Sequence, residues 1–435
     1  MVHHSLLPTN LMEVHSKNIL IFNLKTLHRN VRGFFIYLFI WYLFYMKFYH
    51  YIDSKNIHNN MVKLLNKFNI KTYDITEYDN KVGFFIISTD LFINTTNLNV
   101  LKKYSLYENL FFIINDANEG FPFKDRVLYH IKKYFDSASI SRERIIYSYN
   151  NSINLGITHY SDIELNTIYF PTFFLENPIG PVWDEVNNIK KSTIKTHDFS
   201  LFVKNGKPHK KMAILNVIEN KYNCLMTYAF NRDFESNQIQ KLQTDEFDEH
   251  LDTPNYFKSK IDILIESEYN SYISYNPNGD YNPMDNNFDK MLHLTEKIWR
   301  VVSWGIPFVV VGQKHMLKHL REIGFKTFDT LIDESYDNMD DDVRIYESIK
   351  QSKELLKFYD TPELNYILEY NKNLYLNNVF KKQKLYEFFI NPLKNYIKDL
   401  IWYNVQIFIS LFIFILILVM MCSKTSIIQI INIYM

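Results

Sequence analysis

Short apolar runs alternate with amphipathic stretches through the middle of the chain. Residues 83–88 (GFFIIS) and 110–115 (LFFIIN) are apolar on consecutive positions, which is typical of strands covered on both faces. Similar runs predict strands at 144–149, 201–204, 225–230, 261–265 and 307–311, and an extended run at 325–328. Helical spacing of apolar residues predicts helices at 123–137, 209–221, 288–304 and 314–323. This alternation predicts parallel βαβ units with helices on both faces of each sheet.

A cluster of turn-forming residues divides this region in two. Asn177-Pro178 and Gly180-Pro181 stand between the strands of the first part and those of the second. We therefore expect an N-terminal unit over 60–180 and a C-terminal unit over 181–345, followed by a helical tail over 346–400. The predicted fold class is α/β, with two Rossmann-like domains that face each other across a cleft.

Apolar segments near both ends predict membrane helices. Residues 401–421 (IWYNVQIFISLFIFILILVMM) carry no charge, and at about 1.5 Å per residue they can cross a hydrocarbon core of about 30 Å. A transmembrane helix over 401–422 is favoured over a buried core helix. The aromatic-rich segment 33–52 predicts a second transmembrane or signal-anchor helix, with residues 1–32 cytosolic or otherwise exposed. The predicted location is a membrane, crossed by one or two helices.

The charges beside the two segments leave the orientation open. Basic residues before residue 33 favour a cytosolic N-terminus. Lys394 and Lys398 precede the second segment and outnumber Lys424 after it, which favours the opposite orientation.

Composition excludes several classes of function. The chain has 48 basic and 48 acidic side chains, and this balance argues against a general nucleic-acid binder. With only 10 glycines, a glycine-rich phosphate loop is not expected. Cys224 and Cys422 are the only cysteines, so neither a disulfide framework nor a cysteine-based zinc site can form. We predict no nucleic-acid partner and no metal.

The strongest candidate chemistry follows the predicted strand 261–265. In open parallel sheets, ligands bind beyond the carboxyl ends of the strands. Glu266-Ser267 comes directly after this strand, and Thr295-Glu296-Lys297 precedes the turn at Gly305. A lysine can neutralise a diphosphate, and a carboxylate can accept hydrogen bonds from ribose hydroxyls. Neighbours on a helix point about 100° apart, so we expect Glu296 and Lys297 to face a ligand without pairing. The alternative is an ordinary solvated Glu-Lys pair.

These residues resemble a known family. The sequence is similar to the C-terminal domain of family 10 glycosyltransferases, the α1,3-fucosyltransferases, and especially to the fucosyltransferase-like proteins of large DNA viruses and phages. The resemblance is carried by Glu266-Ser267, Thr295-Glu296-Lys297-Ile298-Trp299, Gly305-Ile306-Pro307-Phe308, Val311-Gly312, residues 317–329 and Asp333-Glu334-Ser335-Tyr336-Asp337. It covers about 200–340 well, 80–200 weakly, and neither apolar terminal segment.

The resemblance implies a metal-independent enzyme with two Rossmann-like domains, an arrangement called GT-B. It implies a nucleotide-sugar donor, which is GDP-fucose in the characterised relatives, and we therefore expect a GDP-sugar and no other cofactor. By position, Glu296 would hold the donor ribose and Lys297 the donor phosphates.

Three positions depart from the family pattern. The family has an Arg after a His early in the first helix of this domain, where this chain has Lys210, and a lysine lacks bidentate geometry toward phosphate. His293 stands where the family has a Tyr, and Ser267 stands where an Asn follows the Glu. These departures weaken the assignment of the donor sugar more than that of the fold.

A sugar transfer also needs a carboxylate that removes the proton of the acceptor hydroxyl. Residues 115–120 (NDANEG) follow a predicted strand of the first unit and hold two carboxylates. Glu119 is the candidate base and Asp116 the second choice. The alternative is that Asp116 and Asn118 only form a turn.

Two further clusters favour structural roles. Asp340-Asp341-Asp342 opens a predicted helix, where acidic residues suit the helix dipole better than a metal site. His315 and His319 have metal-ligand spacing, but a solvated helix face is the favoured interpretation.

The sequence thus predicts a membrane-tethered glycosyltransferase that moves a sugar, with fucose as the first candidate, from a nucleotide sugar to a hydroxyl of a glycan or glycoprotein. Its partners would be the nucleotide sugar, the acceptor and membrane lipid, and the membrane would be a host endomembrane if the chain is viral. The alternative is a catalytically inactive, membrane-anchored binding or structural protein that retains this fold.

Overall fold

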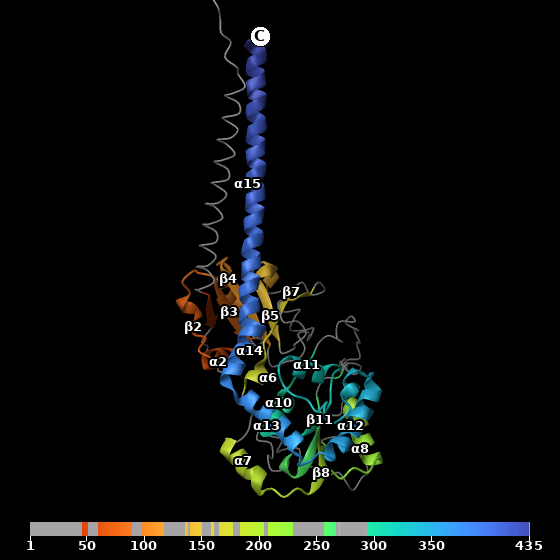
Figure 1. Ribbon diagram of the computed structural model, residues 1–435. Helices are drawn as coiled ribbons and strands as arrows, with labels where there is room; N and C mark the ends of the chain where they lie inside the picture. The colour runs from red at the N-terminus through yellow and green to blue at the C-terminus, as the bar shows by residue number, and fades with distance from the viewer. Residues whose placement is uncertain are drawn as a thin grey trace, which may run out of the picture.

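The computed structural model describes residues 46–50, 60–88, 98–116, 135–137, 140–149, 158–160, 165–176, 183–203, 208–228, 256–266, 269, 292 and 294–434. These residues form two β-sheets flanked by helices, and a helical tail ends in a long helix that leaves the molecule beside the first sheet (Figure 1). The α/β class and the parallel sheets expected from the alternating apolar runs are confirmed.

The first sheet comprises β1 (Lys47–His50), β2 (Thr72–Asp74), β3 (Gly83–Ser88), β4 (Leu110–Asp116), β5 (Ile145–Tyr149), β6 (Thr158–Tyr160) and β7 (Leu165–Tyr169). Their order is β2-β1-β3-β4-β5-β7-β6, and every pair is parallel except β6 with β7. Alternate residues of β3 enter different clusters: Phe84 and Ile86 join one, whereas Phe85 and Ile87 join the other. Because both faces are covered, residues 84–87 are all apolar.

Strand β1 corrects the prediction of a membrane helix over 33–52. Lys47–His50 pairs in parallel with both β2 and β3, so it occupies an interior position of the sheet. Phe48 and Tyr49 are 3% and 1% exposed, and Lys47 Nζ lies 2.8 Å from Asp79 Oδ2. An aromatic run suits a buried strand as well as a membrane, so the helix prediction is wrong for these residues. Residues 33–45 lie outside the described part of the chain.

The second sheet comprises β8 (His197–Val203), β9 (Cys224–Tyr228), β10 (Ser259–Ile265) and β11 (Phe308–Val311). Its order is β11-β10-β8-β9 and all of its pairs are parallel. In both sheets the first strand, β1 or β8, lies inside the sheet, and the chain continues to one side of it and then to the other. Such a reversal of strand order opens a crevice at the carboxyl ends of two neighbouring strands. In the second sheet these strands are β8 and β10.

The helices are α2 (Asn60–Lys67), α4 (Leu98–Ser105), α6 (Thr172–Leu175), α7 (Trp183–Ser192), α8 (Pro208–Glu219), α10 (Glu296–Trp304), α11 (Met316–Glu322), α12 (Asp341–Leu356), α13 (Pro362–Leu376), α14 (Asn378–Leu385) and α15 (Asn391–Tyr434). Short helical turns span Ile75–Glu77, Arg142–Arg144 and Glu334–Asn338, and Tyr386–Ile390 is π-helical. Residues 135–137 of the predicted helix 123–137 are helical, and 123–134 are not described.

The predicted helix over 288–304 begins later than expected. Leu292 and Leu294 are buried but not helical, and Thr295 has an extended backbone (φ −86°, ψ 178°) that makes it the N-cap of α10. Apolar residues of a buried loop here imitated helical periodicity. The predicted end is confirmed, since Gly305 adopts the left-handed conformation (φ 60°) that favours glycine at a helix C-terminus. Residues 325–328 form no strand.

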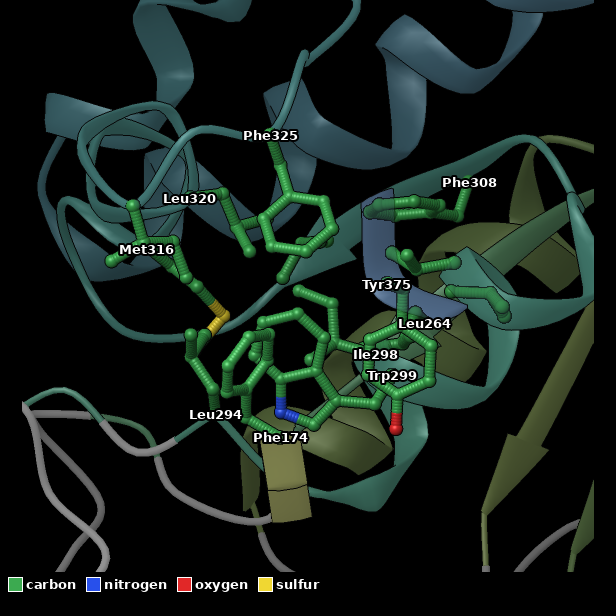
Figure 2. Packing of buried hydrophobic residues seen from close by; sticks show 14 of the residues in the cluster. Phe174, Leu264, Leu294, Ile298, Trp299, Phe308, Met316, Leu320, Phe325 and Tyr375 are labelled. Carbon is green, nitrogen blue, oxygen red and sulfur yellow. The ribbon is translucent and has the colours of Figure 1, made fainter. Parts of the chain in front are cut away.

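Aromatic packing joins the two sheets into one core. Phe174 of α6, which directly follows the first sheet, lies 5.0 Å from Trp299 of α10 between ring centroids. Tyr375 of α13 stacks on the same indole at 5.6 Å and 9° (Figure 2). Helix α13 packs on α10, and α14 packs on α6, so the tail crosses from the second sheet back to the first (Figure 1).

The tail ends in a helix that is long and apolar enough to cross a membrane. Asn378–Val419 is continuous through the π-helical segment. Helix α15 extends to Tyr434 and so contains the whole predicted span 401–422. Large apolar side chains from Trp402 onward are exposed, in contrast to those of a core helix. Among the described residues it is the single helix with these properties.

Candidate functional site

The candidate site lies at the carboxyl ends of β8 and β10, where the strand order reverses. Glu266 directly follows β10, and its backbone N–H donates to the Val311 carbonyl at 3.0 Å. His209, in the first turn of α8, lies with Nε2 3.1 Å from the Glu266 carbonyl oxygen. Since a carbonyl only accepts, Nε2 carries the proton of this hydrogen bond. These bonds fix the backbone of Glu266 where a reversal of strand order creates a binding edge.

The carboxylate of Glu266 is fully buried and is held by the N-terminus of α10. It accepts hydrogen bonds from the Thr295 hydroxyl (2.5 Å) and the Thr295 backbone N–H (3.3 Å). Lys297 Nζ lies 3.5 Å from Glu266 Oε2 and 3.3 Å from Thr295 Oγ1. A buried carboxylate is tolerated only with such donors and a counter-charge. Glu266, Thr295 and Lys297, here called the Glu266 cluster, therefore form one unit.

One prediction about this cluster was wrong. Lys297 Nζ lies 3.7 Å from Glu296 Oε1, so the two neighbours do pair. The lysine side chain is long enough to fold over the helix terminus, and the angle between neighbouring positions does not keep the charged ends apart. Lys297 and Glu296 remain 25% and 35% exposed, so both reach the surface of the edge.

The other predicted site residues are either buried or outside the described part of the chain, or have no described side chain. Lys210 follows His209 in α8 and is only 3% exposed, so its side chain runs inside the protein. Ser267 and His293 lie outside the described residues, as does Glu119. Asp116 is the last residue of β4, opposite Tyr149 of β5 in the register, and its side chain is not among those described.

The structure adds Glu176, which the sequence analysis missed. Glu176 follows α6 at the carboxyl end of β7, and its carbonyl oxygen accepts from Tyr375 Oη (2.7 Å) and Lys381 Nζ (3.1 Å). Burial raises the pKa of the Glu176 carboxyl; the charge of Glu296 adds to this effect, and the charges of nearby lysines oppose it. Because α6 packs on α10, this segment of the first unit lies beside the second unit. The available signal was a carboxylate directly before the Asn177-Pro178 turn.

An aromatic and cationic stack fixes the neighbouring loops. The rings of His209 and Tyr269 lie 5.0 Å apart at 11°, and the Arg344 guanidinium lies 4.5 Å from the Tyr269 centroid. Arg344 Nε also donates to the Gly312 carbonyl (3.0 Å), and Nη2 to Asp341 Oδ1 (2.6 Å). This stack connects α8, the segment after β10 and the start of α12. It was not predicted.

The sequence stretch that carried the viral and phage resemblance has a structural role. Glu334, which is almost fully buried, accepts from Arg321 Nη1 (2.6 Å), Thr327 Oγ1 (2.6 Å) and the Phe328 N–H (2.7 Å). Asp337 caps the first turn of α11 through the N–H groups of Leu317 and Lys318, both at 3.0 Å. Glu334 with Arg321, Thr327 and Phe328 is here called the Glu334 cluster. This cluster and the Asp337 cap together hold the loop after α11 in place.

A surface hollow of about 630 Å³ adjoins that loop. Its described lining consists of His315, Lys318, Arg321, Asp329, Ile332, Asp333, Glu334, Ser335, Asp337 and Asn338. It contains no member of the Glu266 cluster, and its mixed charges favour no single ligand class.

Of the two clusters expected to be structural, the prediction for the histidines was wrong and that for the aspartates is confirmed. His319 is 6% exposed, so the predicted solvated helix face is wrong: this side of α11 packs inward. Asp340 is the N-cap of α12, and Asp341 and Asp342 lie in its first turn, which confirms the predicted helix start. Within the described residues, no group of three or more His, Cys, Asp or Glu side chains could hold a metal ion.

Comparison with known proteins adds no relative: no protein-family model matches the chain, and no curated protein matches it.

Proposed function

We propose that the chain is a membrane-tethered glycosyltransferase that transfers a sugar from a nucleotide-sugar donor to a hydroxyl of a glycan. The proposal includes two Rossmann-like units whose carboxyl edges form the walls of one cleft. It takes the C-terminal helix as the tether and a GDP-sugar as the first donor to test, on the strength of the sequence resemblance.

The Glu266 cluster is the observation that carries the proposal. A buried carboxylate, a threonine hydroxyl and a lysine meet at the strand-order reversal of a parallel sheet, beside the N-terminus of α10. Lysine ammonium and helix N–H groups suit a diphosphate, and the partly exposed Glu296 carboxylate suits ribose hydroxyls. Glu266 positions Thr295 and Lys297 and does not itself need to touch the donor.

The transfer requires a base on the opposite wall. As the acceptor oxygen bonds to the anomeric carbon, the bond from this carbon to the diphosphate breaks and the base takes the hydroxyl proton. Glu176 is a candidate beside Asp116 and Glu119, because it lies near Glu296 and its raised pKa suits a general base. Lys297 would offset the charge of the departing diphosphate.

One observation favours the alternative of an inactive protein that keeps this fold. Lys297 Nζ contacts two carboxylates, at 3.5 and 3.7 Å, so its charge is partly neutralised before any diphosphate arrives. Lys210 is buried and is not displayed at the surface of the edge. Such a protein would bind a nucleotide weakly or would bind it without transfer.

A nucleotide panel tests the proposal. The full chain in detergent is heated with GDP, UDP and CMP, and then incubated with the matching nucleotide sugars and soluble glycans. A ligand at 100 times its Kd stabilises the folded state by about 2.7 kcal/mol, which gives a measurable rise in Tm. We expect GDP to raise Tm and the GDP-sugar to be consumed. A folded chain that responds to none of the nucleotides would contradict the proposal.

The base assignment has its own test. Glu176→Gln should lower kcat by about 10²-fold or more with little change in GDP affinity, because general base catalysis contributes about 10²–10⁴-fold. Glu219→Gln, at the exposed end of α8, is the matched control. Unchanged kcat in Glu176→Gln would return the role to Asp116 or Glu119.

A further inference from the structure

The membrane helix packs against the first sheet in a defined direction. Phe388, just before α15, lies 5.5 Å from Tyr169 at the carboxyl end of β7. Further along the helix, Tyr396 Oη accepts from Asn166 Nδ2 (2.8 Å) and donates to the Glu143 carbonyl (2.6 Å), near the amino ends of β7 and β5. The helix therefore runs antiparallel to the strands. Its exposed apolar part lies beyond the amino ends of the first sheet.

The candidate site lies beyond the opposite edge of that sheet, where the carboxyl ends of its strands are. Helix α6 follows the carboxyl end of β7, and Phe174 of α6 packs on Trp299 of α10. The N-terminus of α10 carries Lys297 of the Glu266 cluster. Figure 1 shows the same order, with α15 leaving beside the first sheet and the second sheet at the far end of the molecule.

A stiff helix connects the level of the candidate site to the exposed apolar segment. The helix is continuous over Asn378–Val419. Pro392 lacks the N–H of a regular helical bond, and the π-helical turn Tyr386–Ile390 precedes it, so this is the one point at which a bend is expected. Phe389 and Leu393 on either side are fully buried, and this packing fixes the bend. No glycine or proline occurs from 393 to 419.

The length of this helix sets the distance between the candidate site and the membrane. Phe380 of α14 packs on Phe174, at the level of α10, with ring centroids 6.0 Å apart. Trp402 and Tyr403 begin the exposed apolar surface, and such aromatic residues mark a membrane interface. Roughly 22 residues separate the two levels, which corresponds to about 33 Å of helix. A typical tilt of about 20° shortens this only slightly.

The headgroup layer is much thinner than this distance. A bilayer of about 40–45 Å with a hydrocarbon core of about 30 Å leaves about 5–8 Å of headgroups on each side. A sugar attached directly to a lipid stays within or just above this layer.

We propose that the helix is a spacer that holds the site about 30 Å from the membrane, so that the acceptor hydroxyl belongs to a glycan carried well above the lipid surface, as on a glycoprotein. Sugars attached directly to lipids are out of reach. This inference rests on the proposed function for its substrate class, whereas the distance itself can be measured without activity.

The distance is tested on the full chain in vesicles that contain headgroup-labelled lipid. A fluorophore is placed by Lys318→Cys, on α11 of the second unit, in a background with Cys224→Ser and Cys422→Ser. Lys398→Cys, just before the apolar segment, is the matched near-membrane label. We expect energy transfer to the lipid to be at least ten-fold weaker from position 318 than from position 398. Equal transfer from the two positions would overturn the spacer, whether or not the protein is active.

Substrate reach is tested with glycans released from glycoproteins and GDP-fucose as donor. The glycans are offered free, coupled directly to a vesicle lipid, or coupled to the lipid through a long poly(ethylene glycol) spacer. We expect transfer to the free and the spaced glycans, and at least ten-fold less to the directly coupled ones. Equal use of the directly coupled glycans would overturn the inference.

A pair of insertions separates stiffness from length. A flexible Gly-Ser insertion of about 12 residues between Lys398 and Asp399 should let the head reach the surface and restore transfer to directly coupled glycans. A helical insertion of the same length should not restore it. If the flexible variant still rejects these glycans while using free ones, the spacer does not set the selectivity. If no glycan is used at all, the proposed function fails, and the energy-transfer result alone decides the spacer.

Discussion

Two buried glutamates in the second unit have nearly the same partners. Glu266 is bound by a threonine hydroxyl, a backbone N–H and a lysine, and Glu334 by a threonine hydroxyl, a backbone N–H and an arginine. The basic partner lies 3.5 Å from Glu266 and 2.6 Å from Glu334. Arginine thus makes a direct hydrogen bond, whereas the lysine ammonium stands further off as a point charge.

The difference lies in where each glutamate stands in the fold. Glu266 follows a sheet strand at the reversal of strand order, whereas Glu334 fastens a loop behind α11. Both stretches contributed to the family resemblance in the sequence. Residue types alone therefore do not separate a candidate ligand site from a structural fastening, and the position on the sheet edge does.

Removing each carboxylate is the strongest test of this comparison. Glu334→Ala and Glu266→Ala should each lower the free energy of unfolding by about 3–5 kcal/mol, because a buried network loses its centre and leaves donors unpaired. Urea denaturation measures this loss. GDP affinity should fall only in Glu266→Ala, measured by calorimetry at a temperature where both variants are folded. A similar loss of affinity in both variants would erase the distinction.

A third buried carboxylate, Asp262, forms no ion pair with the residues that the structure describes. It accepts from Ser200 Oγ (2.8 Å), and burial raises its pKa to about 7, against the lowering influence of Ser200 and the more distant Arg300. The folded chain keeps a proton that the unfolded chain releases near pH 4. The free energy of unfolding should therefore fall between about pH 4 and pH 7.

Asp262→Asn removes this titration. Between pH 4 and pH 8, the free energy of unfolding of the variant should rise by up to about 4 kcal/mol relative to that of the unchanged chain. GDP affinity should change little. Urea denaturation of both proteins at several pH values measures the difference. Parallel pH profiles would show that Asp262 is ionised in the folded state.

Strands such as 83–88 and 261–265, which are covered on both faces of the sheet, were predictable. A continuous apolar run of this length, bounded by polar residues, fits a covered strand better than an amphipathic helix. The errors have physical causes: Phe48 and Tyr49 fill a sheet interior with residues that would also suit a membrane, and Leu294 is buried without being helical. Lengths and terminal residues, such as Gly305, were more informative than periodicity alone.

The site was predictable only in part. Glu266 was singled out because the end of the strand 261–265 can be located from sequence, and Lys297 because its motif resembles the family, although the start of its helix was misplaced. The influence of Glu296 on Glu176 depends on the packing of α6 on α10, two elements distant in the sequence, which one sequence does not encode in any local pattern. The pairing of Glu296 with Lys297 depends on how a flexible side chain folds back, which spacing does not determine.

The two threonines offer a matched pair of smaller changes. Thr295→Val and Thr327→Val each remove one hydrogen bond to a buried carboxylate, which should lower the free energy of unfolding by about 1.5–3 kcal/mol. Thermal or urea unfolding measures the loss. Thr295→Val should also weaken GDP binding, because the hydroxyl positions Lys297 at 3.3 Å. Weaker GDP binding in Thr327→Val alone would reverse the two roles.

Replacing the basic partners of the two glutamates should have the smallest and most selective effect on GDP affinity. Lys297→Met keeps the length of the side chain and removes its charge, so the Kd for GDP should rise about ten-fold, which corresponds to about 1.4 kcal/mol. Arg321→Met should leave this Kd unchanged and lower Tm, since its guanidinium bonds both Glu334 and Thr327.

Raising the salt concentration sharpens the contrast between these variants. A charge contact with a diphosphate at a partly exposed edge is screened, so GDP affinity of the unchanged chain should fall with salt while that of Lys297→Met changes less. If the two salt dependences are equal, Lys297 does not contact the phosphates. The lysine would then act only as the counter-charge of Glu266, and the Glu266 cluster would be a second structural fastening like the Glu334 cluster.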